Sequence, residues 1–239
     1  MNIILFNETE INHNEILLND LRALHIIKIL KCKIGDSIKI GVINGLKGLA
    51  KIEKIYENDS VILKIIDLNI IDEIPKIELI LAMPRPKVLK RLWAQISALG
   101  VSKIHLTNAW KVEKNYFDSH VISENFYKPL LIEGLQQSGN TQLPEVFIYK
   151  RFTSLLNYLG KPSTSIKVLA DPNSDIHIKE LFLMNAKSIF LAIGPEGGWI
   201  SEELSKLQEL NFQLVKLNSR ILRTDTAVIS LLSIISNLN

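Results

Sequence analysis

The sequence has little from which to build a covalent or metal-based scaffold. Its 239 residues include a single cysteine, Cys32, so we expect neither a disulfide framework nor a cysteine-based metal site. The histidines are far apart and show no paired ligand spacing; they are His13, His25, His105, His120 and His177. We therefore expect no zinc site and no other bound metal.

Long apolar segments are missing as well. The longest uncharged stretch, 226–239, is too short to span a bilayer, and no basic-then-apolar signal opens the chain. We therefore expect a cytoplasmic protein without a membrane partner. Hydrophobic residues make up 47% and charged residues 22%, which is ordinary for a globular protein that buries a full core in one large or two smaller domains.

Acidic residues are unevenly spread, and one long segment has none. The net charge is only +3, but residues 75–120 carry 8 Lys and Arg against 3 Asp and Glu. From 79 to 112 there is no acid at all. Such a run is either a solvated basic helix face or a surface for phosphates, and its length favours phosphates. The candidate phosphate contacts are Arg85, Lys87, Lys90 and Arg91.

Residues 1–72 are typical of a small β domain. A strand-like run at 3–6 precedes a predicted helix whose apolar positions recur at three- and four-residue steps: Leu17, Leu18, Leu21, Leu24, Ile27 and Leu30. Strands at 39–43, 49–56 and 61–68, separated by turn signals, then predict a small β-barrel. On the helix, four residues at helical spacing either face RNA or form its solvated side: Arg22, His25, Lys28 and Lys31.

The rhythm changes after an acidic linker at 67–75, and residues 73–239 make the second predicted domain. Strands are predicted near 76–83, 102–107, 145–149, 166–170, 188–193 and 212–217. Helices are predicted near 87–99, 124–138, 151–159, 178–185, 201–210 and 224–236. This alternation predicts an α/β fold with a mostly parallel sheet covered on both faces. Sequence rules alone favour an unknotted doubly wound sheet, because knots are nearly absent from proteins.

Two short segments near the C-terminal end carry the strongest functional signal. Segment 193–199 (IGPEGGW) joins a strand to a helix with an expected N-cap at Ser201, and segment 217–227 (LNSRILRTDTA) joins the next strand to an apolar helix. Ligands bind at such junctions in open α/β sheets. Glycines at 194, 197 and 198 let a flat ligand approach backbone amides. A single Gly-rich turn is more often a plain turn, but two such loops on successive strands favour a pocket.

These residues resemble the SPOUT-class RNA methyltransferases, and among them the RsmE-type 16S ribosomal RNA uridine-N3 methyltransferases. That family carries a GPEGG-(aromatic)-(I/T) loop and an LGxRILRxETA-like loop, which 194–200 and 217–227 match in the same order. Residues 82–91, 98–105, 110–116 and 136–146 also have counterparts. The chain departs from many members at Gln95, Ala98, Gln136, Asn140 and 218–219, which leaves the cofactor loops intact and concerns the RNA contacts.

The resemblance implies a PUA-like RNA-binding barrel at 1–72 and a SPOUT domain with a trefoil knot at 73–239. It further implies S-adenosylmethionine as cofactor, a homodimer, and 16S ribosomal RNA or the small-subunit particle as substrate. Backbone groups of the two loops are expected to hold the adenosine, with apolar side chains against the adenine. The residues expected to bind the cofactor are Ala192, Ile193, Gly194, Pro195, Glu196, Gly197, Gly198, Leu217, Asn218, Ser219, Ile221, Leu222, Arg223 and Thr226.

Methylation of N3 of uracil requires an unpaired base that has lost its N3 proton. We expect Arg223 to stabilise the resulting anion and Glu196 or Asp225 to accept the proton. The structural alternatives are an ion pair between Arg223 and one of these carboxylates, and an orienting role for Asp225.

Two other functional classes stay open. One is another SPOUT RNA methyltransferase, acting on a ribose 2′-oxygen or on tRNA; the barrel-first order and the RILRTDTA sequence favour the uridine-N3 group. The other is a catalytically inactive RNA-binding relative. The departures at Gln95, Ala98 and Asn140 favour this class, whereas the intact loops argue against it.

Overall fold

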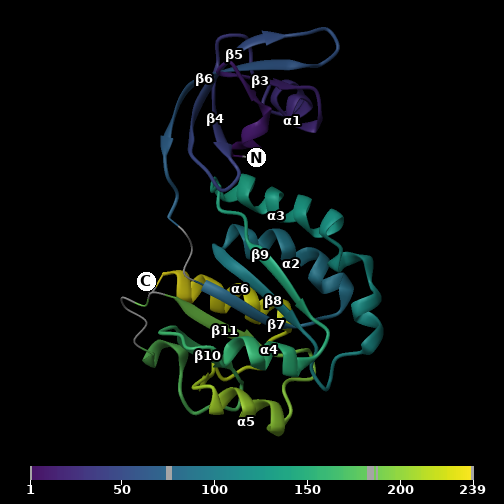
Figure 1. Cartoon of the computed structure of the whole chain (residues 1–239), viewed down its shortest axis with the longest axis vertical. Coiled ribbons are helices and arrows are strands. Elements are labelled where there is room, and N and C mark those ends of the chain that lie inside the picture. Colours follow the sequence, from purple (N-terminus) through teal and green to yellow (C-terminus); the bar gives the residue numbers. More distant parts are fainter. Residues whose placement is uncertain (1, 74–76, 182–185, 187, 238–239) are drawn as a thin grey trace. The chain divides into compact units, whose positions relative to one another are not determined.

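The computed structural model describes residues 2–73, 77–181, 186 and 188–237. It divides into two compact units, coloured purple to blue and teal to yellow for most of their length in Figure 1. The first unit comprises residues 1–74 and 135–143, and the second comprises 75–134 and 144–239. The sequence places the boundary near residue 72, and it gives no sign that residues 135–143 join the first unit.

The first unit is built on a curled six-stranded sheet. Its strands, in the order β1-β4-β5-β6-β3-β2, are β1 (Ile4–Phe6), β4 (Ser37–Val42), β5 (Lys47–Ile55), β6 (Val61–Ile70), β3 (Glu15–Leu18) and β2 (Ile11–Asn12). Only β1 and β4 run parallel; the other pairs are antiparallel. Side chains alternate between core and solvent along β5, so one face of the sheet encloses a core that includes Phe6, Ile16, Ile40 and Ile52.

Hydrogen bonds hold residues 135–143 to this sheet. The Asn44 N–H donates to the Thr141 carbonyl over 2.8 Å, and the Asn2 N–H donates to the Gln136 carbonyl over 2.7 Å. The Asp72 carboxylate accepts from the Thr141 N–H at 2.9 Å and is also paired with Lys47. These contacts join segments far apart in sequence, which explains why periodicity does not reveal them.

The predicted N-terminal helix is wrong in its first part. Leu17 and Leu18 lie in β3, where Leu18 is buried and Leu17 is exposed, as strand alternation requires. Helix α1 (Leu21–Leu24) begins only after Asp20, whose side chain accepts from the Arg22 N–H, and it runs on into a π-helical turn (His25–Ile29). Over so few residues, the spacing of apolar side chains is compatible with both a helix and a strand, so the pattern cannot separate the two.

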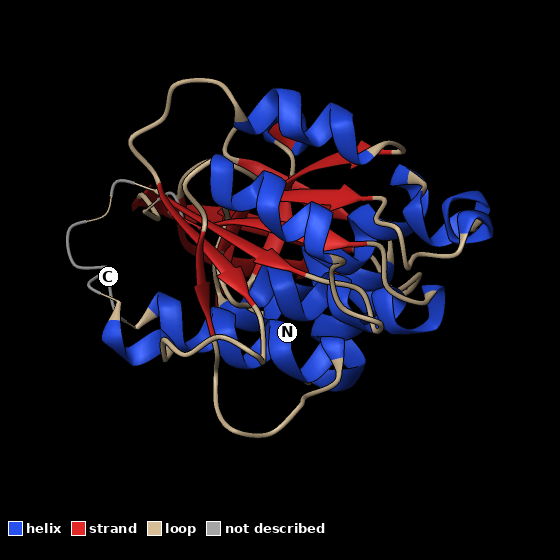
Figure 2. Ribbon diagram, turned by 90° about the horizontal axis from the view of Figure 1, so that it is seen from below, coloured by secondary structure: helices blue, strands red, loops and turns tan. Residues whose placement is uncertain are grey.

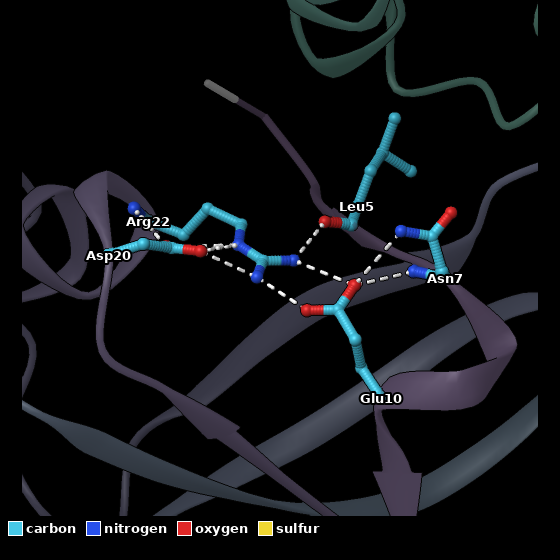
Figure 3. A network of polar contacts seen from close by, with 5 residues as sticks. All are labelled: Leu5, Asn7, Glu10, Asp20 and Arg22. Atoms are coloured by element: carbon cyan, nitrogen blue, oxygen red, sulfur yellow. Dashed lines mark hydrogen bonds and ion pairs between the residues drawn. The ribbon is translucent and has the colours of Figure 1, made fainter.

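Arg22 is the centre of a polar network in this unit (Figure 3). Its guanidinium donates to the Asp20 carboxylate at 2.7–3.1 Å, to Glu10 at 2.5 Å and to the Leu5 carbonyl at 3.0 Å. Glu10 in turn accepts from the Asn7 N–H at 2.7 Å. The network ties α1 to the strands and the turn that precede it.

The second unit contains six strands that all run parallel. Their order is β12 (Gln213–Val215), β10 (Ile166–Ala170), β11 (Ile189–Ile193), β7 (Ile77–Ala82), β8 (Val101–Thr107) and β9 (Glu145–Tyr149). Every residue of β11 is buried, which is the pattern of a parallel strand covered on both faces. The predicted α/β class, with a small β unit first, is confirmed.

Helices lie on both sides of this sheet (Figure 2). They are α2 (Pro86–Ala98), α3 (Glu124–Ser138), α4 (Phe152–Leu159), α5 (Ser201–Glu209) and α6 (Thr224–Ser236). α2 packs against α6, and α4 packs against β8 and β9. Close packing also explains Gly134 of α3, where a Cβ would lie 2.1 Å from the Ala94 carbonyl oxygen of α2.

The predicted elements of this unit lie within a few residues of the observed ones, with one exception. Only a 3₁₀ turn, Ile178–Glu180, stands at the start of the helix predicted at 178–185, and positions 182–185 lie outside the described residues. Two further 3₁₀ turns, Lys114–Asp118 and His120–Ile122, have no counterpart among the predictions. No helix in the described part of the chain is long and apolar enough to cross a membrane.

Candidate active site

A pocket of about 500 Å³ opens at the carboxyl ends of three neighbouring strands, β10, β11 and β12. Because parallel strands end at the same edge, the loops that follow them converge there. The pocket is lined by Lys111, Ala170, Asp171, Pro172, Asn173, Ile193, Gly194, Pro195, Glu196, Gly197, Gly198, Trp199, Ser201, Leu204, Val215, Leu217, Asn218, Arg220, Ile221, Leu222, Thr224, Ala227 and Leu231.

The loop after β11 is a tight turn that its glycines permit. The Gly198 N–H donates to the Pro195 carbonyl over 2.8 Å, and Gly198 takes a φ of +70°, a conformation that side-chain-bearing residues rarely adopt. A Cβ on Gly194 would meet the Trp199 indole at 3.1 Å, so the missing side chain lets the ring fold over the turn. Of the three glycines that the sequence singles out, only Gly198 has a positive φ.

This first loop is held from outside by the segment that follows β8. Lys111 donates from Nζ to the Gly197 carbonyl at 2.7 Å, and its aliphatic stem covers Gly197. Glu203 is only 6% exposed. Its carboxylate accepts from the backbone N–H of Ile200 at 3.1 Å and from the backbone N–H of Trp110 at 2.8 Å. One buried carboxylate therefore joins the start of α5 to the β8 segment.

Helix α5 begins at Ser201, within the predicted range, but the expected N-cap at Ser201 is wrong. Ile200 is the N-cap and Ser201 is the first helical residue. The expected capping role of Ser201 is replaced by Glu203, which reaches back from the third helical position to the Ile200 N–H. An acid three residues into a helix is the sequence signal that could have identified Glu203.

The loop after β12 is less constrained. The Asn218 side chain accepts from the Arg220 N–H at 2.7 Å, which forms a local turn, and Ser219, Arg220 and Ile221 are exposed. Helix α6 starts at Thr224, with Arg223 as its N-cap. The loop therefore brings a cation to a helix N-terminus, where the partial positive charge of the backbone also attracts anions.

The candidate catalytic residues differ in how the fold engages them. Asp225 is 19% exposed and pairs with Arg91 at 2.9 Å and with Arg223 at 3.4 Å. The Arg223 side chain is 72% exposed, and a 3.4 Å contact leaves most of its donors open. Glu196 is exposed and accepts from the Arg85 N–H at 3.1 Å.

The structure brings most of the candidate cofactor residues to the pocket wall. The exceptions are Ala192, which is buried within β11, and Ser219, Arg223 and Thr226, which are exposed and do not line the pocket. Sequence reasoning missed the 170–173 loop and Lys111. The 170–173 loop carries no glycine or charge pattern, and its only signal is that it follows a strand of the same parallel sheet.

The candidate RNA contacts fall into two groups. Arg85, Lys87, Lys90 and Arg91 are exposed at the start of α2, although Arg91 is engaged by Asp225 and Lys90 lies 5.9 Å from the Phe126 ring centre. In the first unit, Arg22 is only 20% exposed within its network, and Lys28 pairs with Asp59 at 2.8 Å. Lys31 is exposed, with a φ of 54°.

His25 does not have the surroundings of a ligand or a base. Burial lowers the pKa of its imidazole below the ordinary value. Its Nε2 is buried and finds no hydrogen-bond partner among the described residues. For Arg22 and His25, this geometry favours the structural alternative over an RNA contact.

The pocket has the features that S-adenosylmethionine requires. Its volume lies within the range of small-molecule sites, and Ile193, Leu217, Leu222 and Leu231 offer an apolar surface for a flat base. The indole N–H of Trp199 is buried at the pocket wall without a hydrogen-bond partner in the described part of the chain. A buried donor without an acceptor is rare in folded proteins, and a polar ligand in the pocket would supply one.

Comparison with known proteins gives concordant matches for both units. Residues 72–236 match the model of an RNA methyltransferase domain, and residues 18–66 match that of an RNA methyltransferase PUA domain. The chain is 32% identical to ribosomal RNA small subunit methyltransferase E of Treponema pallidum, over 95% of this chain and 87% of that protein. It is 31% identical to ribosomal RNA small subunit methyltransferase E 1 of Borreliella burgdorferi, over 95% and 93%.

A solved structure shares the fold over nearly the whole length. Ribosomal RNA small subunit methyltransferase E from Neisseria gonorrhoeae, solved with S-adenosyl methionine bound, superposes with a TM-score of 0.81 at 21% identity. The match covers 100% of this chain and 98% of that one.

Proposed function

We propose that this chain, which belongs to the RNA methyltransferase family and carries that family's PUA domain, transfers a methyl group from S-adenosylmethionine to 16S ribosomal RNA, at N3 of a uridine. The observation that carries the proposal is the pocket at the β10–β12 edge. It combines an apolar wall, the buried Trp199 indole N–H, which has no acceptor in the described part of the structure, and the exposed Arg223 beside it.

The two loops divide the work of binding. The β11 loop, with its tight turn and the Lys111 and Glu203 contacts, is rigid enough to hold the cofactor in one position. Leu217 and Leu222 offer the adenine an apolar surface. When bound, the cofactor supplies an electrophilic methyl group on sulfur. Holding that group in line with the acceptor atom can lower the barrier substantially, because positioning removes the entropy cost of the encounter.

The chain's own residues must manage a proton and a negative charge. The N3 proton of uracil has to leave before nitrogen can attack. Asp225 already balances two arginines, whereas Glu196 is exposed and, among the described residues, accepts a hydrogen bond only from the Arg85 backbone N–H. We therefore assign Glu196 as the proton acceptor and Asp225 as a residue that orients Arg91 and Arg223. The open Arg223 guanidinium stabilises the uracil anion.

We also propose a homodimer. Ile221 lines the pocket and is 86% exposed within one copy, so this wall has room for a contact from a second chain. Sedimentation of the purified protein at several concentrations tests this, and a strictly monomeric, active enzyme would contradict it.

The function is tested with labelled S-adenosylmethionine and either 16S ribosomal RNA or small subunits from a strain that lacks the homologous methylation. Mass spectrometry of the nucleosides should show labelled 3-methyluridine, and no label should be incorporated when the 16S RNA is already modified. A 2′-O-methyl nucleoside, or label in tRNA, would instead identify another branch of the superfamily. Saturable cofactor binding without methylation of any of these RNAs would identify an inactive RNA-binding relative.

A further inference from the structure

We propose that Trp110 is a stacking platform for a base of the RNA substrate, held by Glu203 at the rim of the cofactor pocket. This inference rests on the proposed function, because it concerns the RNA that the site acts on. It assigns a role to the segment between β8 and the 3₁₀ turn at Lys114–Asp118, which belongs to neither the loop after β11 nor the loop after β12.

Trp110 differs sharply from the other two tryptophans of the chain. Trp93 is 0% exposed and Trp199 is 8% exposed, whereas Trp110 is 79% exposed. A tryptophan ring in water forgoes the burial of a large apolar area. Single exposed apolar residues are common and need no explanation by themselves. The backbone beneath Trp110 is what makes this one different.

Main-chain contacts fix the position of the backbone that carries this ring. The backbone N–H of Trp110 donates to the buried Glu203 carboxylate at 2.8 Å. The neighbours Ala109 and Val112 are 6% and 7% exposed, and the Val112 N–H donates to the Ala109 carbonyl over 3.0 Å. The main chain is thus anchored on both sides of the ring, and only two side-chain torsions stay free. Such a preorganised aromatic surface loses little entropy when a ligand stacks on it.

The ring is also in the right place. The next residue, Lys111, lines the pocket and contacts Gly197. Glu203 joins Trp110 to the start of α5, whose residues Ser201 and Leu204 line the same pocket. A base that enters to be methylated must leave its neighbours unstacked, and proteins hold such bases on aromatic faces.

The surrounding charge favours RNA over a protein partner. Trp110 lies inside the acid-free stretch 79–112, whose exposed cations Arg85 and Lys87 suit phosphates. The acid bonded to the Trp110 main chain, Glu203, is buried and accepts from two backbone N–H groups, so it presents no negative surface to RNA. An aromatic face beside basic side chains is the usual composition of a single-strand-binding surface.

The first test compares Trp110→Ala and Trp110→Phe with the wild type in binding of 16S RNA and in single-turnover methylation. Alanine should weaken RNA affinity on the order of tenfold or more, the usual loss for one base–aromatic stack. Phenylalanine should restore most of the affinity, and cofactor affinity should stay unchanged in both variants. Ile148→Ala, which also removes exposed apolar surface from this unit, serves as the matched control and should bind RNA like the wild type.

The second test measures the accessibility of the Trp110 ring directly. Because the other two tryptophans are buried, quenching of fluorescence by iodide reports mainly on Trp110. Bound 16S RNA should protect this fluorescence, and Trp110→Phe should lack the quenchable component.

Three outcomes would overturn the inference. The first is unchanged RNA affinity in Trp110→Ala while the wild type methylates 16S RNA. The second is fluorescence that stays fully quenchable in the RNA complex. The third is dissociation of a dimer by Trp110→Ala, which would assign the ring to a contact between copies. A wild-type protein that binds RNA with Trp110 protected but transfers no methyl group would instead refute the proposed function and leave the platform standing.

Discussion

Arg22 in the first unit and Arg223 beside the pocket differ in how much of their bonding capacity the fold uses. Arg22 donates to two carboxylates and a carbonyl, and its side chain is 20% exposed. The Arg223 side chain has one ion pair within the described ranges, at 3.4 Å to Asp225, and is 72% exposed. Both lie at the start of a helix, and from the sequence both are candidates for contacts with RNA.

The surroundings of these two arginines decide which one can act on a ligand. Five donors in a fixed fork can be used once, either inside the protein or on a substrate. In the first unit, Asp20 and Glu10 stand close enough to take them. At α6, Asp225 is shared with Arg91, and its 3.4 Å contact with Arg223 leaves most donors of that guanidinium open. The difference teaches that a basic residue is a binding candidate only after its acidic neighbours are counted.

The largest expected effect is the loss of methylation rate when Arg223 is replaced. Arg223→Ala should lower the single-turnover methylation rate on the order of 10²-fold or more, the usual loss for a preorganised charge-stabilising group. Arg223→Lys keeps the charge without the planar fork and should retain partial activity. The rate is measured at saturating cofactor and RNA, with thermal melting alongside. A rate near wild type, or a melting temperature low enough to explain the loss, would make Arg223 as structural as Arg22.

The next effect concerns the buried carboxylate that holds the β11 loop. Glu203→Ala leaves the Ile200 and Trp110 N–H groups without their acceptor, which should cost about 1–3 kcal/mol of folding free energy. Cofactor affinity should fall on the order of tenfold, because the loop depends on preorganisation. Calorimetry and thermal melting measure both. Glu202→Ala is the matched control, since that exposed neighbour pairs with Lys206 on the same helix and with no other cation that the structure describes. Equal losses in the two variants would contradict the role of Glu203.

A smaller effect is expected at the basic start of α2. Lys87 has no acidic partner among the described residues, so it is free to meet a phosphate as Arg223 is free to meet a base. Lys87→Ala should reduce the salt dependence of RNA binding by about 0.7–0.9 log-log units for one lost contact. Lys128→Ala, which removes a cation already paired with Glu124, is the control. An unchanged slope for Lys87→Ala would show that this face is merely solvated.

Sequence patterns predict the second unit much better than the first. Its strands alternate with helices longer than a turn, so periods of two and of 3.6 residues are easy to separate. In the first unit, Leu17 and Leu18 fit either period, and the sequence pattern assigns both to a helix although they lie in β3. The knot was implied by the family resemblance alone, because topology rules favour unknotted chains.

The pocket could be predicted in part, for a definable reason. Its two main loops carry glycines and arginines, which stand out in a sequence. Asp171 and Lys111 line the same pocket but belong to loops without such signals, and only the shared edge of a parallel sheet brings them there. Glu203 and Trp110 are 93 residues apart, so their hydrogen bond has no local signature at all.

The smallest expected effect on activity, and a direct test of the comparison, is Arg22→Ala. Hydrogen bonds from Arg22 lower the pKa of Asp20, and although burial alone would raise the pKa of Glu10, bonds from Arg22 and Asn7 bring it below its ordinary value. A lowered pKa means that the folded state favours the charged carboxylate, so the stabilisation is complete above the ordinary pKa and is lost as pH falls through the folded value. The variant should lose about 1–3 kcal/mol of stability at pH 7 through unpaired partly buried carboxylates. The difference in melting temperature from wild type should narrow below about pH 4, where carboxylates take up protons.

Methyl-transfer rate and RNA affinity should stay near wild type in the folded variant. Lys28→Ala, which breaks an exposed pair in the same unit, should change the melting temperature little at any pH. A loss of RNA affinity in Arg22→Ala without loss of stability would return Arg22 to the RNA-binding surface and remove the contrast with Arg223.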